Sequence, residues 1–355
     1  IYERRGNMVL VTGGAGFLGS VLVKKLIELD KKVRILALKN EDLSSLKDYN
    51  VEIVYGDVRD EKIIYEIMDG VDEVYHLASM ISITSNKPDV LYDINVNGVV
   101  NVAKNAVKRN VKSMVYVSSI HSFADLINGF VIDETIPISP INAIGTYGKT
   151  KAIATLKIKE YVEKGLNCKI VCPSGIIGPF DYRPSRMGKL ILDYLKGKVW
   201  YTLNGGYNFV DVRDVAEGCI LASQYGKNGE VYLLTGEYLS FDELYKQISL
   251  KIKKEKKLIR IPDFILSIVA YIEDIFVNRR GREPLVTAES LTIIKSNAKA
   301  SCKKATDELG YSYRPIDQTL NDTVDWFLFY FKDEINRSKK LSSRKHTKTL
   351  QISNR

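Results

Sequence analysis

The stretch Val9-Leu-Val-Thr-Gly-Gly-Ala-Gly-Phe-Leu-Gly-Ser20 decides the fold. It joins a short apolar run, typical of a buried strand, to three glycines, and an amphipathic stretch follows over 21–29. Gly13 can adopt a backbone conformation that other residues avoid, Gly16 leaves room for a phosphate, and Gly19 lets a helix pack closely on the strand. An ordinary strand-to-helix turn is the alternative interpretation, but the flanking strand and helix patterns favour a dinucleotide site at a helix N-terminus.

Strand-like and helical patterns alternate through the first half of the chain. The strand-like runs occupy 8–12, 33–38, 51–55, 73–78, 113–118 and 169–173. Amphipathic stretches such as 90–108 and 146–163 lie between them. This alternation is typical of a parallel sheet with helices on both faces, which binds ligands beyond the carboxyl ends of its strands. We therefore expect an α/β protein with a Rossmann-type, doubly wound parallel sheet over 7–179.

Beyond residue 179 the pattern becomes mainly helical and predicts a smaller substrate-binding lobe over 180–331. Segments near 207–236 are expected to return to the sheet. The most apolar helical stretch, 261–277, carries three acidic residues and is too short to span a bilayer. We expect no transmembrane segment, and a core or lid helix is favoured here over one that contacts a membrane surface.

The positive charge of the chain is concentrated at its end. The net charge is +9, and residues 332–355 contribute +6 of it, so the remainder carries only +3. A basic, disordered tail over 332–355 is favoured over a nucleic-acid or membrane-binding arm, and we expect no nucleic-acid partner. The four cysteines lack the spacing of metal ligands, and no signal segment is recognised, so we expect no metal site and a cytoplasmic location. A homodimer is among the assemblies that we consider.

Tyr147-Gly-Lys-Thr-Lys151 is the second decisive motif. Tyr147 and Lys151 stand four residues apart at the start of a predicted helix and share one face. A nearby ammonium favours the phenolate, so we expect the pKa of Tyr147 to fall from about 10 toward the working pH, which suits proton transfer during hydride transfer. Lys151 can also hydrogen-bond the nicotinamide ribose. Tyr-x-x-x-Lys alone is common on solvated helices, but its position one strand–helix unit after Ser118-Ser119 favours catalysis.

The strand-like run 115–119 brings hydroxyl groups to the expected site. We expect Ser119 to donate a hydrogen bond to a substrate carbonyl oxygen, and Ser118 to cap the strand end. His121 lies two residues further along and stays outside the predicted catalytic set, because a loop histidine with no visible partner is more often structural.

Over about 8–331 these residues resemble the extended short-chain dehydrogenases/reductases. The motifs that carry the resemblance are Thr12-Gly-Gly-Ala-Gly-Phe-Leu-Gly19, Gly56-Asp-Val58, His76-Leu-Ala-Ser79, Asn95-Val-Asn-Gly98, Ser118-Ser119 and Tyr147 with Lys151. The stretches 33–46 and 308–326 look most like the dihydroflavonol-reductase-like branch, which borders on hydroxysteroid dehydrogenases.

The resemblance implies a catalytic trio of Ser119, Tyr147 and Lys151, with Asn95 supporting a proton relay. It also implies a cofactor site made of Gly13, Ala15, Gly16, Phe17, Leu18, Gly19, Asp57, Val58, Leu77, Ala78, Ser79, Tyr147, Lys151 and Pro173. From the residues alone, Asp57 is equally explained as a strand-end cap and Asn95 as a helix cap.

The choice of cofactor departs from both usual patterns. An NAD enzyme places an acid near the end of the second strand, and an NADP enzyme places an arginine there. This chain has Ala37 and Leu38, followed by Lys39. The missing acid favours NADP over NAD.

Two functions compete. The favoured one is an oxidoreductase that interconverts a ketone and a secondary alcohol on a hydrophobic or ring-shaped small molecule. The alternative is a nucleotide-sugar epimerase or dehydratase with tightly bound NAD, in which Arg183, Arg186 and Arg213 would bind a diphosphate. The intact trio disfavours a third reading, a binding protein without enzymatic activity.

Overall fold

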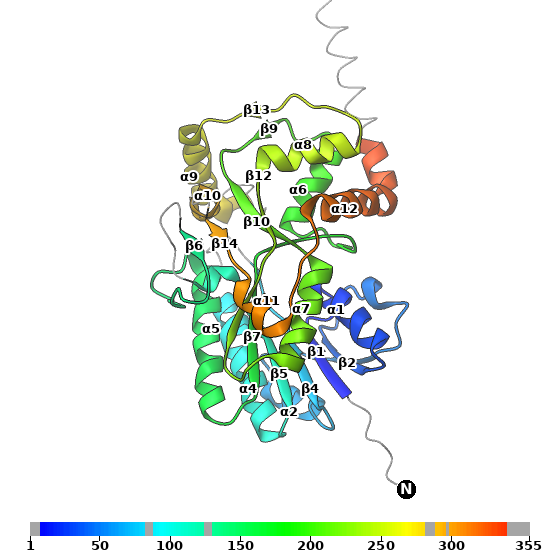
Figure 1. Ribbon diagram of the computed structural model, residues 1–355, viewed down its shortest axis with the longest axis vertical. Coiled ribbons are helices and arrows are strands. Elements are labelled where there is room, and N and C mark those ends of the chain that lie inside the picture. Colours follow the sequence, from blue (N-terminus) through cyan, green and yellow to red (C-terminus); the bar gives the residue numbers. More distant parts are fainter. Residues whose placement is uncertain (1–7, 82–87, 124–129, 281–287, 296–297, 339–355) are drawn as a thin grey trace, which may run out of the picture.

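The computed structural model describes residues 8–81, 88–123, 130–280, 288–295 and 298–338. A large sheet covered by helices forms the lower part of the molecule, and a smaller lobe lies above it (Figure 1). No helix in these described ranges has the length and apolar character needed to cross a bilayer.

The main sheet has seven parallel strands in the order β11-β7-β5-β4-β1-β2-β3. They are β1 Met8–Thr12, β2 Lys32–Ala37, β3 Glu52–Tyr55, β4 Glu73–His76, β5 Ser113–Val117, β7 Cys168–Pro173 and β11 Val231–Leu234. The chain runs outward from β1 through β2 to β3, and then returns to start again at β4 on the other side of β1. This reversal creates a crevice at the carboxyl ends of β1 and β4, where ligands bind in such sheets.

Both faces of the sheet are buried, as the continuous apolar strands predict. Val9 and Val11 pack in a cluster with α1, α7 and α11, whereas Leu10 packs on the opposite face with α2, α4 and α5. Successive side chains of a strand point to opposite faces, so both layers need apolar residues. The helices are α1 Phe17–Glu28, α2 Glu61–Ile67, α4 Gly98–Lys108, α5 Gly145–Glu163, α7 Val212–Tyr225 and α11 Lys303–Leu309. The predicted fold class is confirmed.

The lobe has its own apolar core. Helices α6 (Arg186–Leu195), α8 (Phe241–Lys251) and α12 (Ile316–Tyr330) pack around it. They pack with a three-stranded sheet in which β10 (Gly206–Asp211) lies between β8 (Gly175–Ile177) and β12 (Glu237–Ser240).

Smaller elements complete the described chain. A second, smaller cluster joins α9 (Asp263–Arg280) to α10 (Ala288–Lys295) through Leu266, Ala270 and Leu291. The remaining elements are α3 Pro88–Tyr92, the short helices η1 Ser44–Leu46, η2 Asp93–Asn97 and η3 Ile120–Ser122, and two ribbons that pair β9 Tyr201–Thr202 with β13 Ile259–Arg260 and β6 Val131–Ile132 with β14 Lys299–Ala300.

The C-terminal segment differs from the expected disordered tail over 332–355. Residues 332–338 are helical, and Ile335 is only 2% exposed in the core of the lobe. Glu334 forms an ion pair with Lys196 at 2.6 Å. This single apolar anchor was too short a pattern to predict a helix, and the rest of the expected tail, 339–355, lies outside the described residues.

Candidate functional site

A cleft of about 840 Å³ lies at the carboxyl ends of the central strands and extends onto the lobe. Most of the predicted site residues line it, namely Gly13, Gly16, Phe17, Leu18, Gly19, Asp57, Val58, Leu77, Ala78, Ser79, Ser119, Tyr147, Lys151 and Pro173. Two predicted residues, Ala15 and Asn95, do not. The lobe contributes Arg183 and Arg186, which the sequence offered as diphosphate ligands for the alternative function, and Tyr207, which it did not indicate.

The glycine-rich turn has the shape that a dinucleotide requires. Gly13 has φ +73°, and a Cβ on it would lie 2.8 Å from the backbone nitrogen of Ala78. A Cβ on Gly19 would lie 2.1 Å from the carbonyl oxygen of Gly13, so α1 can pack on the turn only with glycine there. Gly16 caps α1 without a side chain, and the first turn of α1 carries no acid. The N–H groups at this helix end can therefore bind a pyrophosphate, and the residues present fit the cofactor.

Ala15 supports the turn through its backbone, while its buried side chain stays out of the cleft lining. Its carbonyl oxygen accepts hydrogen bonds from Ser45 Oγ at 3.2 Å and from Arg183 Nη2 at 3.0 Å. Arg183 belongs to the lobe, so this bond ties the lobe to the phosphate-binding turn. In the structure, Ala15 thus contributes to the turn through its backbone and not through its side chain.

The residues after β3 and β4 form the adjoining wall. The Arg59 guanidinium binds both carboxylate oxygens of Asp57, at 3.0 and 2.7 Å, and holds the pKa of Asp57 below its usual value. Ala78 is fixed by a hydrogen bond from its N–H to Thr12 Oγ1 at 3.3 Å. Contact of these residues with a nucleotide remains a prediction.

Asn95 lies outside the cleft lining because it is almost completely buried, within the π-helical turn η2. Its Oδ1 accepts from the Met80 N–H at 2.8 Å and from Ser79 Oγ at 3.0 Å. Its Nδ2 donates to the Met80 carbonyl oxygen at 2.9 Å and to Thr150 Oγ1 at 3.2 Å. Asn95 thereby joins the loop after β4 to α5, and π-turns of this kind often mark functional sites.

The structure brings Ser119, Tyr147 and Lys151 to the same part of the cleft. Ser119 follows β5, and the other two lie on the first turns of α5. The hydroxyls of Ser119 and Ser79 lie near that of Tyr147 and favour its ionised form. Burial outweighs that effect and raises the pKa of Tyr147 to about 12. The expectation that Lys151 lowers this pKa is therefore not met.

Lys151 itself is turned toward the sheet. Its side chain is 2% exposed, its Nζ donates to the Val117 carbonyl oxygen at 2.9 Å, and it lies 5.2 Å from the centre of the Tyr116 ring. No carboxylate pairs with it among the ion pairs of the described residues. Burial lowers the pKa of Lys151 to about 7. Ser118 bonds Thr155 Oγ1 at 2.7 Å, which agrees with a supporting role at the strand end.

His121 has a partner that sequence reasoning missed. Its Nε2 lies 2.6 Å from the hydroxyl of Tyr207, 86 positions away in the chain. The rings of His121 and Tyr147 meet edge to face, with centres 6.3 Å apart. Burial lowers the pKa of His121 to about 4, so the ring is neutral at physiological pH. His121 and Tyr207 also border a second, apolar pocket lined by Ile120, Phe123, Ile132, Ile144 and Ile293.

The ribose end of the cleft contains an acid that was not expected there. Lys39 is exposed and outside the cleft lining, whereas Leu38 and Glu41 are part of it. Glu41 accepts a hydrogen bond from the Leu38 N–H at 3.1 Å and lies 3.8 Å from Arg183 Nη2. The glutamate stands four residues after the strand ends, and the intervening turn brings it back to the cleft.

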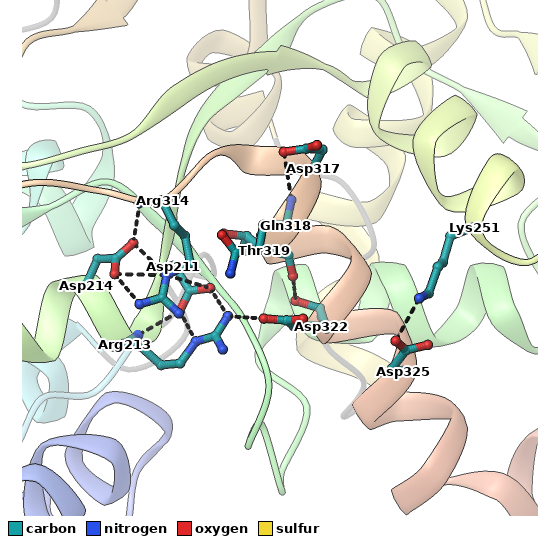
Figure 2. A network of polar contacts seen from close by, with 11 residues as sticks. Asp211, Arg213, Asp214, Lys251, Arg314, Asp317, Gln318, Thr319, Asp322 and Asp325 are labelled. Carbon is teal, nitrogen blue, oxygen red and sulfur yellow. Dashed lines mark hydrogen bonds and ion pairs between the residues drawn. The ribbon is translucent and has the colours of Figure 1, made fainter.

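The three arginines proposed for a diphosphate separate into two groups. Arg183 and Arg186 line the cleft, but Arg213 does not. Figure 2 shows Arg213 directed at Asp211 and Asp322, each with an N–O distance of 2.7 Å. Arg213 thus forms ion pairs with two carboxylates, and its pair with Asp322 links α7 to α12.

A model described as the NAD dependent epimerase/dehydratase family matches residues 9–234. The chain belongs to this family. The matched segment includes the glycine turn, the Ser119–Tyr147–Lys151 trio and β11, so membership agrees with the predicted resemblance to extended short-chain dehydrogenases/reductases.

Relatives in the epimerase/dehydratase family cover nearly the whole chain. Sterol demethylase protein B of Methylococcus capsulatus is 30% identical, over 90% of this chain and 97% of the relative. The putative dihydroflavonol 4-reductase of Synechocystis is also 30% identical, over 89% and 93%. The crystal structure of gox2253 has a TM-score of 0.80 and 32% identity, over 91% and 98%. The expected class, a nicotinamide-dependent enzyme that acts on CH–OH groups, is confirmed.

Proposed function

We propose that the protein interconverts a ketone and a secondary alcohol on a hydrophobic, ring-shaped small molecule. The observation that carries this proposal is the position of the Ser119–Tyr147–Lys151 trio beside a neutral wall and an apolar pocket. Two relatives whose names refer to a sterol and to a dihydroflavonol support the same substrate class.

The residues of the trio have distinct roles in this proposal. A bound nicotinamide cofactor supplies or accepts the hydride at the carbinol carbon. Ser119 donates a hydrogen bond to the substrate oxygen, where negative charge develops during ketone reduction, and Tyr147 delivers the proton to that oxygen. With a pKa of about 12, Tyr147 is protonated at neutral pH, which suits the reduction direction. Lys151, which lines the cleft, would contact the nicotinamide ribose.

His121 and Tyr207 form the part of the cleft that would contact the substrate body. The pair is neutral at physiological pH and lines both the cleft and the apolar pocket. Such a wall favours an apolar molecule with a neutral polar group over an anionic one, because a buried charge without a partner is unfavourable.

A nucleotide-sugar epimerase or dehydratase is the second candidate. Arg183 and Arg186 in the cleft favour it, since a diphosphate needs cationic partners. Arg213 counts against it, because its ion pairs with Asp211 and Asp322 remove it from the set available to a diphosphate.

We propose NAD(H) as the preferred cofactor, which reverses the expectation from the sequence. That expectation rested on the absence of an acid near the end of β2. Glu41 supplies one in the cleft lining, while Lys39 lies outside it. A carboxylate accepts a hydrogen bond from a ribose 2′-hydroxyl and repels a 2′-phosphate.

The retention of cofactor distinguishes the two functions. The purified protein is dialysed and then denatured, and the nicotinamide cofactor that it releases is quantified. In a separate assay of the native protein, absorbance at 340 nm is followed with NADH and cyclic ketones, or with UDP-glucose. A reductase loses its cofactor on dialysis and oxidises NADH in proportion to the ketone consumed. Retained NAD, together with sugar epimerisation and no net change in NADH, would support the second candidate instead.

A further inference from the structure

Helix α9 exposes a continuous apolar face. Five side chains at helical spacing are between 39% and 66% exposed, namely Phe264, Ile265, Ile268, Val269 and Ile272. Leu266 and Ala270 point the other way and are buried against Leu203 and Ile261. Positions 264, 265, 268, 269 and 272 lie on one side of a helix with 3.6 residues per turn. The exposed side of this helix therefore carries apolar groups where a solvated helix would carry polar ones.

The ribbon that precedes α9 also exposes apolar groups. Ile259 on β13 is 63% exposed, and its N–H donates to the carbonyl oxygen of Trp200, whose side chain is 59% exposed. The ribbon is anchored to the buried side of α9, because Ile261, at the end of the ribbon, packs in the same cluster as Leu266 and Ala270. Exposed aromatic and aliphatic groups gathered in this way are unusual on a surface that meets only water.

Positive charge surrounds the ribbon. Residues 251–260 contain six Lys/Arg and one acid. Lys251 pairs with Asp325 and Arg260 with Asp242. Lys253, Lys254 and Lys257 are exposed and form no ion pair among those of the described residues. These three ammonium groups are available to an external anion.

The last described residue, Ser338, lies at the end of α6. The Ser338 hydroxyl donates to the carbonyl oxygen of Lys196 at 3.2 Å, and Lys256 donates to the carbonyl oxygen of Tyr194, on the same end of α6. In Figure 1 the β9/β13 ribbon lies at the end of the molecule that is farthest from the main sheet. Residues 339–355, which follow, contain six Lys/Arg and no Asp/Glu.

We propose that this end of the lobe docks on an anionic lipid bilayer. The α9 face, with Trp200 and Ile259, would enter the boundary between headgroups and acyl chains, while Lys253, Lys254 and Lys257 would contact lipid phosphates. The charge argues against a second copy of this chain as the occupant, because two such surfaces would bring like charges together. The sequence pattern favoured a core or lid helix at α9, and the exposed fractions of its side chains change that preference.

Vesicle binding of the full-length protein tests the proposal, with Trp200 as an internal probe. Sedimentation with phosphatidylcholine vesicles, with and without phosphatidylglycerol, measures the bound fraction. We expect binding only to the anionic vesicles, release by high salt, and a blue shift of tryptophan emission that is absent in Trp200→Phe. The second tryptophan, Trp326, is stacked on Tyr330 and packs against the core of the lobe, so it should contribute a constant signal.

Variants assign the binding to this surface. Phe264→Ser/Ile268→Ser should weaken vesicle affinity about tenfold or more, whereas Leu29→Ser, which alters an exposed leucine at the end of α1, should not. Neutralising Lys253, Lys254 and Lys257 to Gln should weaken binding by a similar factor and flatten its salt dependence. Circular dichroism melts check that each variant is folded.

Three results would overturn the proposal. They are no binding of the full-length protein to anionic vesicles, equal binding by the Phe264/Ile268 and Leu29 variants, and a dimer in light scattering that the Phe264/Ile268 variant dissociates. The last would assign the surface to a second copy of the chain. None of these measurements depends on the enzymatic reaction.

Discussion

The Lys151 ammonium donates a hydrogen bond to the carbonyl oxygen of Val117 at 2.9 Å, and this bond holds the start of α5 against the end of β5. The same contact places a cation where almost no solvent reaches it. The chain thus keeps a group, to which we assign a role in the reaction, at a cost in folding free energy, and that cost depends on pH.

Replacing Lys151 by Met should therefore stabilise the protein while impairing activity. The pKa of Lys151 is 10.5 in the unfolded chain and about 7 in the folded one, so the unfolded chain binds more protons between these values and stability rises with pH across that window. Below pH 7 the full penalty applies. Lys151→Met should then raise the free energy of unfolding by about 1–3 kcal/mol, and by less at pH 10. Thermal melts at pH 6 and 10 measure this, and a lower Tm at pH 6 would contradict it.

Tyr147→Phe should lower kcat by roughly 10²–10⁴ with cofactor affinity changed only a few-fold, because it removes the transferable proton and little contact area. Tyr116→Phe is the matched control. The Tyr116 hydroxyl is buried and has no hydrogen-bond partner, so its removal should leave turnover intact. Steady-state rates and cofactor titration compare the two variants, and activity of Tyr147→Phe within tenfold of wild type would refute the assigned role.

Tyr207→Phe should raise KM about fivefold or more while kcat changes little, since the hydroxyl that orients His121 is lost but the trio remains. Because the pKa of His121 is about 4, neither the wild type nor the variant should show a change in KM between pH 6 and 8 that is due to this histidine. Tyr330→Phe, outside the cleft lining, serves as control. A loss confined to kcat would show that the pair acts in the chemical step instead.

Glu41→Gln should weaken NAD(H) binding and strengthen NADP(H) binding, changing the ratio of the two dissociation constants by about tenfold or more. Lys39→Glu adds an acid outside the cleft lining and should leave that ratio nearly unchanged. Fluorescence titration of both cofactors against both variants decides the matter. A shift produced by Lys39→Glu alone would restore the NADP preference that the sequence suggested.

Arg213→Ala should destabilise the fold by about 2–4 kcal/mol, because it leaves the fully buried carboxylate of Asp211 without its closest cation. The activity per folded molecule should persist, since Arg213 lies outside the cleft lining. Urea unfolding and rates measured well below the transition separate the two effects. A large rise in KM with unchanged stability would place Arg213 in a substrate site and favour the sugar-nucleotide reaction.

Local features of the chain were predictable because they depend on neighbouring residues. The turn that Gly13 and Gly19 permit, the apolar strand before it and the shared helix face of Tyr147 and Lys151 follow from backbone conformation and periodicity. The alternation of strands and helices likewise predicts a parallel sheet, and the carboxyl ends of its strands predict where the site lies.

Features that depend on burial or on distant partners were not predictable. Sequence spacing placed Lys151 near Tyr147 and suggested a lowered pKa, but desolvation by the surrounding core raises the pKa of Tyr147.

The sequence by itself thus determined the fold class, the glycine turn and the shared helix face of Tyr147 and Lys151, because these follow from periodicity and from spacing along the chain. Only the tertiary structure paired His121 with Tyr207, returned Glu41 to the cleft and removed Arg213 from the residues available to a ligand. It also decided that one side of α9 is exposed, although its apolar pattern resembles that of a core helix. The reason is the same in each case, since contact and solvent exposure depend on how distant segments pack, and no local pattern contains that information.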